Sequence, residues 1–528
     1  MAGSGERRRG GGVNGRDDTI FAVSSGAGRA GVAVIRLSGP GTGEALARLA
    51  GSLPEPRRAS LRPLTDPRSG EVLDRGLVLW FPGPKSFTGE DAGEFQIHGG
   101  RAVVAGVIES LGRIAGLRLA EPGEFTRRAF DNGCLNLSEV EGLADLIAAE
   151  TAAQRRQALQ QLDGSLSRRI GDWTARLTRA LAFLEAAIDF ADEDLPGDLE
   201  ERVGSILTPL CEEIEDALAD RHVGERLRDG LSVAILGAPN AGKSSLLNAL
   251  SRRDAAIVSE RAGTTRDLLE VALDLDGLPV TLVDTAGLRE GESGLDPVER
   301  EGMRRARARA ASADLKLVLF DLSALPDLDA ASLEFLDARA LVVLTKSDLW
   351  RGEVGAGALP GALSGHETIA ISVKSGTGLD RLTGALGAAA SAALDGGGMP
   401  AVVTRARHRR AMEEALAGIR RAREAAEAAM AAEDLRLALA ALGRIVGQVG
   451  VEDLLDVIFR EFSIGKRGGA SRETPRQTRR LWPCWRARPN RLTSQARLPQ
   501  IAVDCEWRAA RAGCLKPLIR PGTSKPGM

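Results

Sequence analysis

The residues best suited to chemistry form a phosphate-binding loop near the middle of the chain. Residues 237–244 are GAPNAGKS; they follow the apolar run VAILG and precede the helical pattern SSLLNAL. This G-x-x-x-x-G-K-S spacing lets backbone N–H groups face phosphate oxygens at a helix N-terminus, where the helix dipole favours anions. We expect Lys243 to reach the β- and γ-phosphates and Ser244 to bind Mg²⁺. The loop therefore predicts a nucleoside triphosphate site.

A second motif is suited to choosing the base. Residues 345–348, TKSD, follow an apolar run, and the Asp348 carboxylate can accept hydrogen bonds from the ring N–H and the exocyclic amine of guanine. Adenine presents no such pair of donors. Thr345 stands where GTPases usually have Asn, so it keeps a hydroxyl but loses an amide, which predicts weaker base affinity. Residues 372–374, SVK, stand where a backbone N–H would contact the guanine oxygen. The expected nucleotide is GTP.

Two more segments are suited to sensing the γ-phosphate. In residues 263–267, GTTRD, Thr265 can close the Mg²⁺ shell, and in residues 284–287, DTAG, Asp284 can hold the metal through water. The next residue is Leu288, where a Ras-like enzyme has a Gln that orients the attacking water. Because Leu288 has no hydrogen-bonding group, hydrolysis must be activated in another way or be very slow.

These motifs must be positioned by a parallel sheet. The runs VAILG, VTLVD, LKLVLFD, LVVLTK and TIAIS alternate with helical segments, which is typical of strands buried on both faces of an α/β sheet. We expect this P-loop GTPase domain (Ras-like) over residues 229–391. Upstream, strand-like runs at 19–25, 31–39, 76–82 and 94–98, with helical patterns at 41–50 and 101–115, predict an α+β domain over residues 17–133.

An α-helical domain is expected in two parts, residues 134–228 and 392–466, with the GTPase domain inserted between them. Apolar residues from Leu159 to Ile188 recur at steps of three and four, which predicts one face of a single long amphipathic helix that packs on other helices. Ser138 and Glu141 have the spacing of a capping box. A second helical stretch is expected over 405–462, with Leu435, Leu439, Leu442 and Ile445 on one face.

Composition and charge indicate the character of the two chain ends and exclude some classes of protein. No apolar run approaches the ~18 residues that would cross a bilayer, and residues 1–16, basic and Gly-rich, are expected to be a disordered leader. Outside the last 62 residues the chain has two Cys, which suggests no disulfide framework and fits a reducing cytoplasm. Residues 467–528 hold 14 Lys and Arg against 3 Asp and Glu. This tail has no periodicity; we expect it to be unstructured and favour read-through sequence over a basic arm for RNA.

The order of these segments resembles the tRNA uridine-modification GTPases, the MnmE or TrmE family. The resemblance rests on DDTIFAVSSGAGRAGVAVIRLSGP, FPGPKSFTGEDAGEFQIHGG, EPGEFTRRAFDNG, the GTPase motifs and LLDVIFREFSIGK, and it spans about residues 17–466. It implies a folate-binding N-terminal domain and a homodimer. It also implies a flavoprotein partner, MnmG, which carries FAD and joins it in a heterotetramer or larger complex. Together they would add a (carboxymethyl)aminomethyl group to C5 of the wobble uridine of certain tRNAs, with the carbon from methylene-tetrahydrofolate.

The resemblance also implies roles in GTP hydrolysis. A K⁺ ion beside the phosphates would replace an arginine finger, and Glu299 matches an acid that helps to position water, so the expected catalytic residues are Lys243, Asp284 and Glu299. Mg²⁺ would be held by Ser244 and Thr265, and K⁺ by Asn240, Ser259, Arg261 and Thr264. The expected GTP-binding residues are Asn240, Ala241, Gly242, Lys243, Ser244, Ser245, Ser259, Glu260, Arg261, Ala262, Gly263, Thr264, Thr265, Asp284, Thr285, Ala286, Gly287, Thr345, Lys346, Asp348, Ser372, Val373 and Lys374.

For folate, the resemblance implies contacts from Arg36, Glu94, Cys134 and Lys466. Cys134 stands where the family commonly has Lys or Arg, so a cation that could pair with the folate carboxylates is lost. Family chains typically end Phe-Cys-Ile-Gly-Lys, whereas residues 462–466 here are FSIGK and the chain continues. The Ser463 hydroxyl is a far poorer nucleophile than a thiol.

Two other functions stay open. One is an RNA-binding ribosome-assembly GTPase without covalent chemistry, and the other is a paralogue that keeps only the GTPase activity, suggested by Cys134 and Ser463 together. The N-terminal segments favour tRNA modification, because an assembly factor would be expected to carry a recognisable RNA-binding module.

Overall fold

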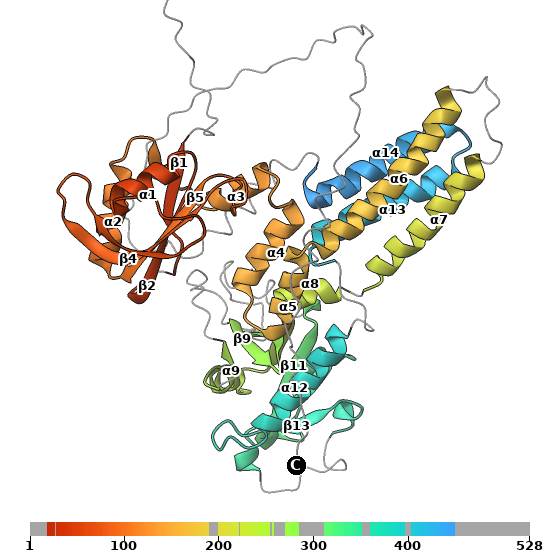
Figure 1. Cartoon of the computed structure of the whole chain (residues 1–528). Helices are drawn as coiled ribbons and strands as arrows, with labels where there is room; N and C mark the ends of the chain where they lie inside the picture. Colours follow the sequence, from red (N-terminus) through yellow and green to blue (C-terminus); the bar gives the residue numbers. More distant parts are fainter. Residues whose placement is uncertain are drawn as a thin grey trace, which may run out of the picture. The chain divides into compact units, whose positions relative to one another are not determined.

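The computed structural model of the chain describes residues 18–26, 28–189, 199–220, 222–253, 256–257, 270–284, 311–350, 360–395 and 403–448. The chain divides into two compact units, residues 1–467 and 468–528, and every described residue belongs to the first unit (Figure 1). None of the helices in the described ranges is long and apolar enough to span a membrane.

The N-terminal part is built on a six-stranded mixed sheet with strand order β3-β4-β5-β2-β1-β6. Its strands are β1 (Thr19–Val23), β2 (Ala30–Ser38), β3 (Ser60–Thr65), β4 (Val72–Phe81), β5 (Ala92–Gly99) and β6 (Leu117–Leu119). Helices α1 (Thr42–Ala50) and α2 (Arg101–Gly112) pack on one face through a core that includes Ile35, Leu46, Phe95 and Leu111. The predicted strands and helices are present, and α3 (Glu124–Asp131) follows them.

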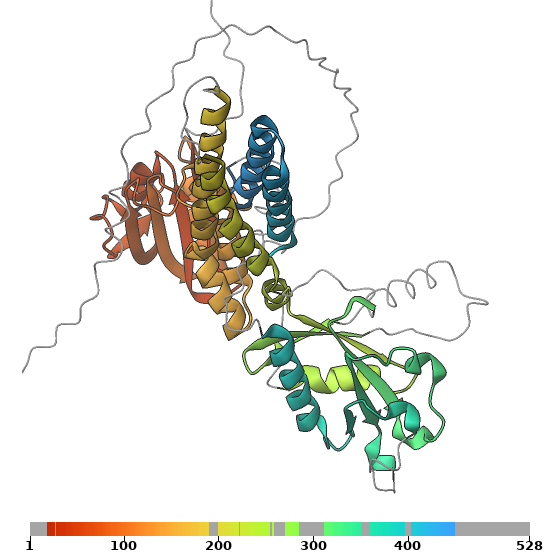
Figure 2. The same cartoon turned by 90° about the vertical axis from the view of Figure 1, so that its right-hand side faces the viewer.

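The GTPase sheet has strand order β13-β12-β11-β7-β10-β9-β8. Its strands are β7 (Leu231–Gly237), β8 (Ala256–Ile257), β9 (Glu270–Leu275), β10 (Leu278–Asp284), β11 (Leu315–Asp321), β12 (Ala340–Thr345) and β13 (Thr368–Ala370). Its helices include α9 (Lys243–Ser251) and α11 (Ala330–Leu333) between the strands and α12 (Leu379–Leu394) after the last one. Each of the five predicted apolar runs forms a strand, and β7 pairs in parallel with both β10 and β11. Helices α9 and α12 pack on the same face of the sheet (Figure 2).

The helical part contains α4 (Leu137–Ala148), α5 (Ala152–Leu162), α6 (Ser165–Asp189), α7 (Leu199–Leu218) and α8 (Val223–Asp229), and later in the chain α13 (Ala406–Glu424) and α14 (Ala428–Val446). Helices α6, α7, α13 and α14 lie side by side and share one apolar core (Figure 1). Leu435, Leu442 and Ile445 are buried in that core and Leu439 packs against it, as predicted.

The prediction of one long helix over Leu159–Ile188 is wrong. The chain forms two helices, α5 and α6, separated at Asp163 and Gly164. Gly164 has φ +81°, a left-handed conformation that ends α5 and that glycine adopts without steric cost. The apolar stripe continues across the break, but Leu159 is 40% exposed and does not join the core.

The predicted capping box is also displaced along the chain. The N-cap of α4 is Asn136, whose side chain accepts a hydrogen bond from the Glu139 N–H, while the Glu139 side chain accepts one from the Asn136 N–H. Ser138 lies inside the helix and donates to Asn136 Oδ1. Glu141 is therefore not used for capping. It is buried and faces α13, where Arg407 and His408 bind it.

Candidate functional site

The phosphate-binding loop leaves β7 through a sharp backbone turn. Gly237 has φ +148°, and a Cβ at this position would lie only 2.6 Å from the carbonyl oxygen of Leu319 on β11. Any side chain here would push the loop away from the sheet. Gly242, at φ +96°, is the N-cap of α9. The two glycines therefore let the loop curl closely at the start of α9, as a phosphate site requires.

Lys243 lies inside this curl. Its side chain is buried, and Nζ donates hydrogen bonds to the carbonyl oxygens of Gly237 at 2.7 Å and Ala238 at 2.9 Å. The ammonium group is thus held against the loop that would surround a phosphate. Ser244 follows in the first turn of α9 and is exposed, and Asn240 and Ser245 are exposed as well. A hydroxyl in this position can bind Mg²⁺ together with phosphate oxygens, since Mg²⁺ usually takes few protein ligands.

The predicted base-recognition residues lie beside this loop. Thr345 is buried, and its Oγ1 lies 2.8 Å from the carbonyl oxygen of Ala241 and 3.2 Å from that of Phe320, so its single proton goes to one of them. The hydroxyl therefore ties the end of β12 to the phosphate loop. Lys346 has φ +57° and forms an ion pair with Asp321 at 2.6 Å. These contacts bring the two motifs together from strands β7, β11 and β12.

Asp348 is exposed and oriented by Ser372, whose Oγ donates to Asp348 Oδ1 at 2.7 Å. This hydrogen bond lowers the pKa of Asp348 below its ordinary value, so the carboxylate is ionised and able to accept at neutral pH. Ser372 is buried, whereas Val373 is half-buried and Lys374 exposed. The structure thus joins the two segments that the sequence assigns to the guanine base.

Several predicted residues lie outside the described part of the chain. Asp284 ends β10, and of this residue only the backbone is described. The others are the loop residues Ser259, Glu260, Arg261, Ala262, Gly263, Thr264 and Thr265, then Thr285, Ala286, Gly287, Leu288 and Glu299, and near the chain end Ser463 and Lys466. Within the described residues, no group of three or more His, Cys, Asp or Glu could hold a metal ion.

A second polar site lies on the face of the N-terminal sheet opposite α1 and α2. Arg36 on β2 stands opposite Glu94 on β5, and its Nε and Nη2 donate to Glu94 Oε1 at 3.0 Å and 2.9 Å. The Arg36 guanidinium lies over the ring of Phe87, with Cζ 5.5 Å from the ring centroid. Phe87 belongs to the loop of residues 82–91 between β4 and β5.

Cys134 adjoins the same loop from the other side. A methyl group on Gly89 would lie 2.9 Å from Cys134 Sγ. Partial burial raises the pKa of the Cys134 thiol, so this residue supplies neither a cation nor a thiolate at neutral pH. The structure therefore gathers three of the four residues expected at a folate site, Arg36, Glu94 and Cys134, around residues 86–91.

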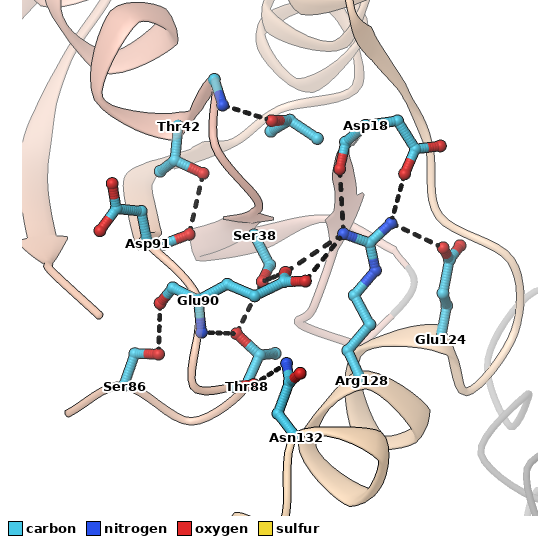
Figure 3. Close-up of polar contacts among 12 residues, drawn as sticks. Asp18, Ser38, Thr42, Ser86, Thr88, Glu90, Asp91, Glu124, Arg128 and Asn132 are labelled. Carbon is cyan, nitrogen blue, oxygen red and sulfur yellow. Dashed lines mark hydrogen bonds and ion pairs between the residues drawn. The ribbon is translucent and has the colours of Figure 1, made fainter. Parts of the chain in front are cut away.

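An ion network centred on the buried Arg128 fixes that loop (Figure 3). Arg128 on α3 donates from Nη2 to Asp18 Oδ1 at 2.7 Å and to Glu124 Oε1 at 3.1 Å, and from Nη1 to Glu90 Oε2 at 3.1 Å. Arg118 binds Asp18 and Glu124 as well. Burial opposes ionisation of Glu124, but the two arginines outweigh it and lower its pKa. Three carboxylates and two guanidinium groups thus share one cluster.

The same end of the loop is also held by short polar contacts. Ser38 Oγ lies 2.7 Å from Thr88 Oγ1 and donates to Glu90 Oε2 at 2.6 Å. Asn132 Nδ2 donates to the carbonyl oxygen of Thr88 at 2.7 Å. Sequence reasoning missed Phe87 and Arg128 as functional candidates. Both lie in segments that carried the family resemblance, SFTGED and FTRRAF, which was the one signal available.

Comparison with known proteins identifies the family of this chain. A family model described as "GTP-binding protein TrmE N-terminus" matches residues 19–134, and one described as "MnmE helical domain" matches residues 137–462. Two relatives are each named tRNA modification GTPase MnmE. The one from Paramagnetospirillum magneticum is 55% identical over 451 residues, which cover 85% of this chain and 100% of the relative. The one from Rhodospirillum rubrum is 53% identical over 469 residues, covering 85% and 99%.

The chain is more than 50% identical to a relative over that relative's full length. It also has the phosphate loop, the Asp348 carboxylate in the base motif and an N-terminal domain that matches the family model. The chain therefore belongs to the MnmE (TrmE) family of tRNA modification GTPases and is a GTP-hydrolysing enzyme of tRNA modification.

Proposed function

We propose that this chain, with a flavoprotein partner of the MnmG type that carries FAD, adds a (carboxymethyl)aminomethyl group to C5 of the wobble uridine of certain tRNAs. The carbon would come from methylene-tetrahydrofolate bound by the N-terminal domain of a cytoplasmic homodimer. The observation that carries the proposal is the convergence of Arg36, Glu94 and Cys134 on one loop of the domain that matches the TrmE N-terminus.

GTP binding is proposed at the phosphate loop and at Thr345, Asp348 and Ser372, with Mg²⁺ on Ser244 and Thr265. Support comes from Lys243 inside the loop and from Asp348 held by Ser372. A K⁺ ion on Asn240, Ser259, Arg261 and Thr264 would activate hydrolysis where Leu288 cannot orient water, and Glu299 would help to position that water. The roles in K⁺ binding and of Glu299 are proposals from the family resemblance.

A second candidate is a paralogue that hydrolyses GTP without modifying tRNA. Two observations favour it: the position of Cys134 lacks a cation, and its neutral thiol cannot replace one. Ser463 in place of Cys would remove a nucleophile as well.

The test is mass spectrometry of wobble uridines in a strain that lacks its own family member and is complemented with this chain. Four versions are compared: the unaltered chain, a stop after Lys466, Ser463→Cys, and both edits combined. Modified uridine with any version, dependent on the flavoprotein, supports the proposal. Unmodified uridine with all four, while each purified version hydrolyses GTP normally, would favour the GTPase-only paralogue.

A further inference from the structure

Asp321 is a carboxylate at the end of β11 that is not among the residues expected to bind GTP. In the parallel pairing of β11 with β12 it stands opposite Thr345, the first residue of the base motif. Asp321 Oδ1 accepts hydrogen bonds from the Ser323 N–H at 3.0 Å and from Ser323 Oγ at 2.6 Å. Asp321 Oδ2 accepts one from Lys346 Nζ at 2.6 Å. Because both oxygens have partners, the carboxylate is held in one orientation beside the base motif.

Lys346 has a backbone conformation that a residue with a Cβ rarely adopts. Its φ of +57° is left-handed, which is disfavoured for most residues other than glycine. This conformation makes Lys346 the N-cap of the short 3-10 helix η2 (Ser347–Leu349), which contains Asp348. A disfavoured turn persists only where its surroundings hold it. The ion pair with Asp321 is therefore one of the contacts that keep Asp348 in place.

The Asp321–Lys346 pair is partly shielded from water. The side chain of Lys346 is 37% exposed and that of Asp321 is 23% exposed. Burial tends to raise the pKa of Asp321, but the hydrogen bonds from Lys346 and Ser323 outweigh burial and lower it. Asp321 is therefore ionised at neutral pH. Partial shielding and a fixed geometry make such a pair stronger than a freely exposed one.

The position of Lys346 connects this pair with nucleotide binding. Lys346 lies between Thr345, whose Oγ1 is 2.8 Å from the carbonyl oxygen of Ala241 in the phosphate loop, and Asp348, which is suited to the base edge. A guanine nucleotide that reaches both the phosphate loop and Asp348 must pass Lys346. The methylene groups of a lysine can cover an apolar or aromatic surface while the ammonium group stays with a charged partner. With one end fixed in the backbone and the other at Asp321, this stem loses little freedom when a base binds.

We propose that Asp321 is a positioning residue for the guanine base, and that it acts by holding Lys346 so that the lysine stem covers one face of the base. This inference rests on the proposed guanine site and adds to it a residue that does not contact the nucleotide. Thr345 makes the pair more important. Its hydroxyl has a single proton where the usual Asn has an amide, so the motif has fewer links of its own to the phosphate loop.

The test is steady-state GTP hydrolysis by the full chain, with KM and kcat measured separately. Asp321→Asn keeps the size of the side chain but removes its charge, so KM for GTP should rise about fivefold while kcat stays the same. The matched control is Asp337→Asn. Asp337 pairs with Lys316 at 3.0 Å near the start of β11, so this variant removes a similar ion pair from the opposite end of the same strand, and KM should stay within about twofold.

A second variant shows whether Asp321 acts through Lys346. Lys346→Met keeps an unbranched side chain but has no ammonium group, so it should raise KM by about the same factor as Asp321→Asn. The two changes combined should raise KM no further, because the second removes nothing that the first has left in place.

The inference can fail in separate ways. Unchanged KM in Asp321→Asn would show that the pair does not serve nucleotide binding. A further rise of KM in the combined variant would show that Asp321 acts by a route other than Lys346. Equal rises in Asp321→Asn and Asp337→Asn would mean a general loosening of the sheet, and a lower kcat at unchanged KM would give Asp321 a role in hydrolysis instead. If the unaltered chain does not prefer GTP to ATP, the proposed guanine site is itself wrong, and this inference with it.

Discussion

Glu141 is a buried carboxylate whose loss should destabilise the helical part. It is 1% exposed, and Arg407 and His408 donate to it at 2.6 Å and 2.9 Å. Burial alone would raise the pKa of Glu141, but the charge and hydrogen bonds of His408 and Arg407 outweigh burial and hold the pKa at about 2. Against an ordinary value of 4.5, that corresponds to about 3 kcal/mol of folding free energy.

Glu141→Gln should therefore destabilise the chain by about 3 kcal/mol, because the variant leaves the half-buried Arg407 without a charged partner. For a cooperatively unfolding domain of roughly 150–250 residues, a loss of about 3 kcal/mol lowers Tm by about 6–12 °C. Differential scanning calorimetry of the full chain measures the shift. The control is Glu414→Gln, which breaks the exposed Glu414–Arg444 pair and should cost under about 1 kcal/mol. Equal shifts in the two variants would refute the assignment of stability to the buried network.

The same network sets a pH dependence. The folded-state pKa of Glu141 lies below its unfolded value, so its contribution is complete above pH 4.5 and is lost as the pH falls toward 2. Burial lowers the pKa of His408 and outweighs the attraction of Glu141, so stability should already begin to fall below pH 6.5. Glu141→Gln should flatten the part of the profile below pH 4.5.

The nucleotide site gives three further predictions. Asp348→Asn should shift preference from GTP toward xanthosine triphosphate, because an amide N–H replaces an acceptor; full GTP affinity in the variant would show that Asp348 does not recognise the base. GTP hydrolysis should be much faster in K⁺ than in Na⁺, and Asn240→Ala should remove the difference, whereas equal rates in both salts for the unaltered chain would exclude cation activation. Thr345→Val should weaken GTP binding several-fold by releasing the carbonyl oxygen of Ala241, and unchanged affinity would show that this link is dispensable.

The strands could be predicted well because the apolar pattern that marks a buried strand lies within a few consecutive residues. The five buried runs of the GTPase sheet are nearly continuous apolar segments, which is the pattern of strands buried on both faces. Strand β3 escaped prediction because it contains Pro63 and lies at the sheet edge, where a missing N–H is tolerated. The break at Gly164 was missed because the apolar spacing continues through it.

The polar clusters could not be predicted in the same way. Arg128 binds Asp18 and Glu90, which lie 110 and 38 residues earlier in the chain. Glu141 binds residues more than 260 positions away, across the whole inserted GTPase domain. No local periodicity connects such partners, so only the fold shows that these charges are paired. These distant partners also explain why Glu141 does not cap α4. Its carboxylate binds Arg407 and His408, and Glu139 takes the capping position instead.

The Arg128 network provides a final prediction about the folate loop. Arg128 is 9% exposed and uses both Nη atoms to reach three carboxylates. Arg128→Lys keeps the charge but replaces a planar fork with one ammonium group, which cannot contact Asp18, Glu90 and Glu124 from the same directions. Loss of even one charge-assisted hydrogen bond in this cluster costs about 1.5–3 kcal/mol.

The loop of residues 82–91 should then open more often, because Glu90 is one of its links to the α3 region, another being the hydrogen bond from Asn132 to Thr88. Hydrogen exchange of peptides from this loop should accelerate in Arg128→Lys, and the affinity for 5-formyltetrahydrofolate should fall several-fold. GTP hydrolysis should not change, because the contacts described for the phosphate loop come from β7, β11 and β12. Arg58→Lys, at an exposed pair with Glu55, is the control and should leave exchange and binding as they are. Faster exchange without a loss of folate affinity would mean that the loop is fixed for stability alone.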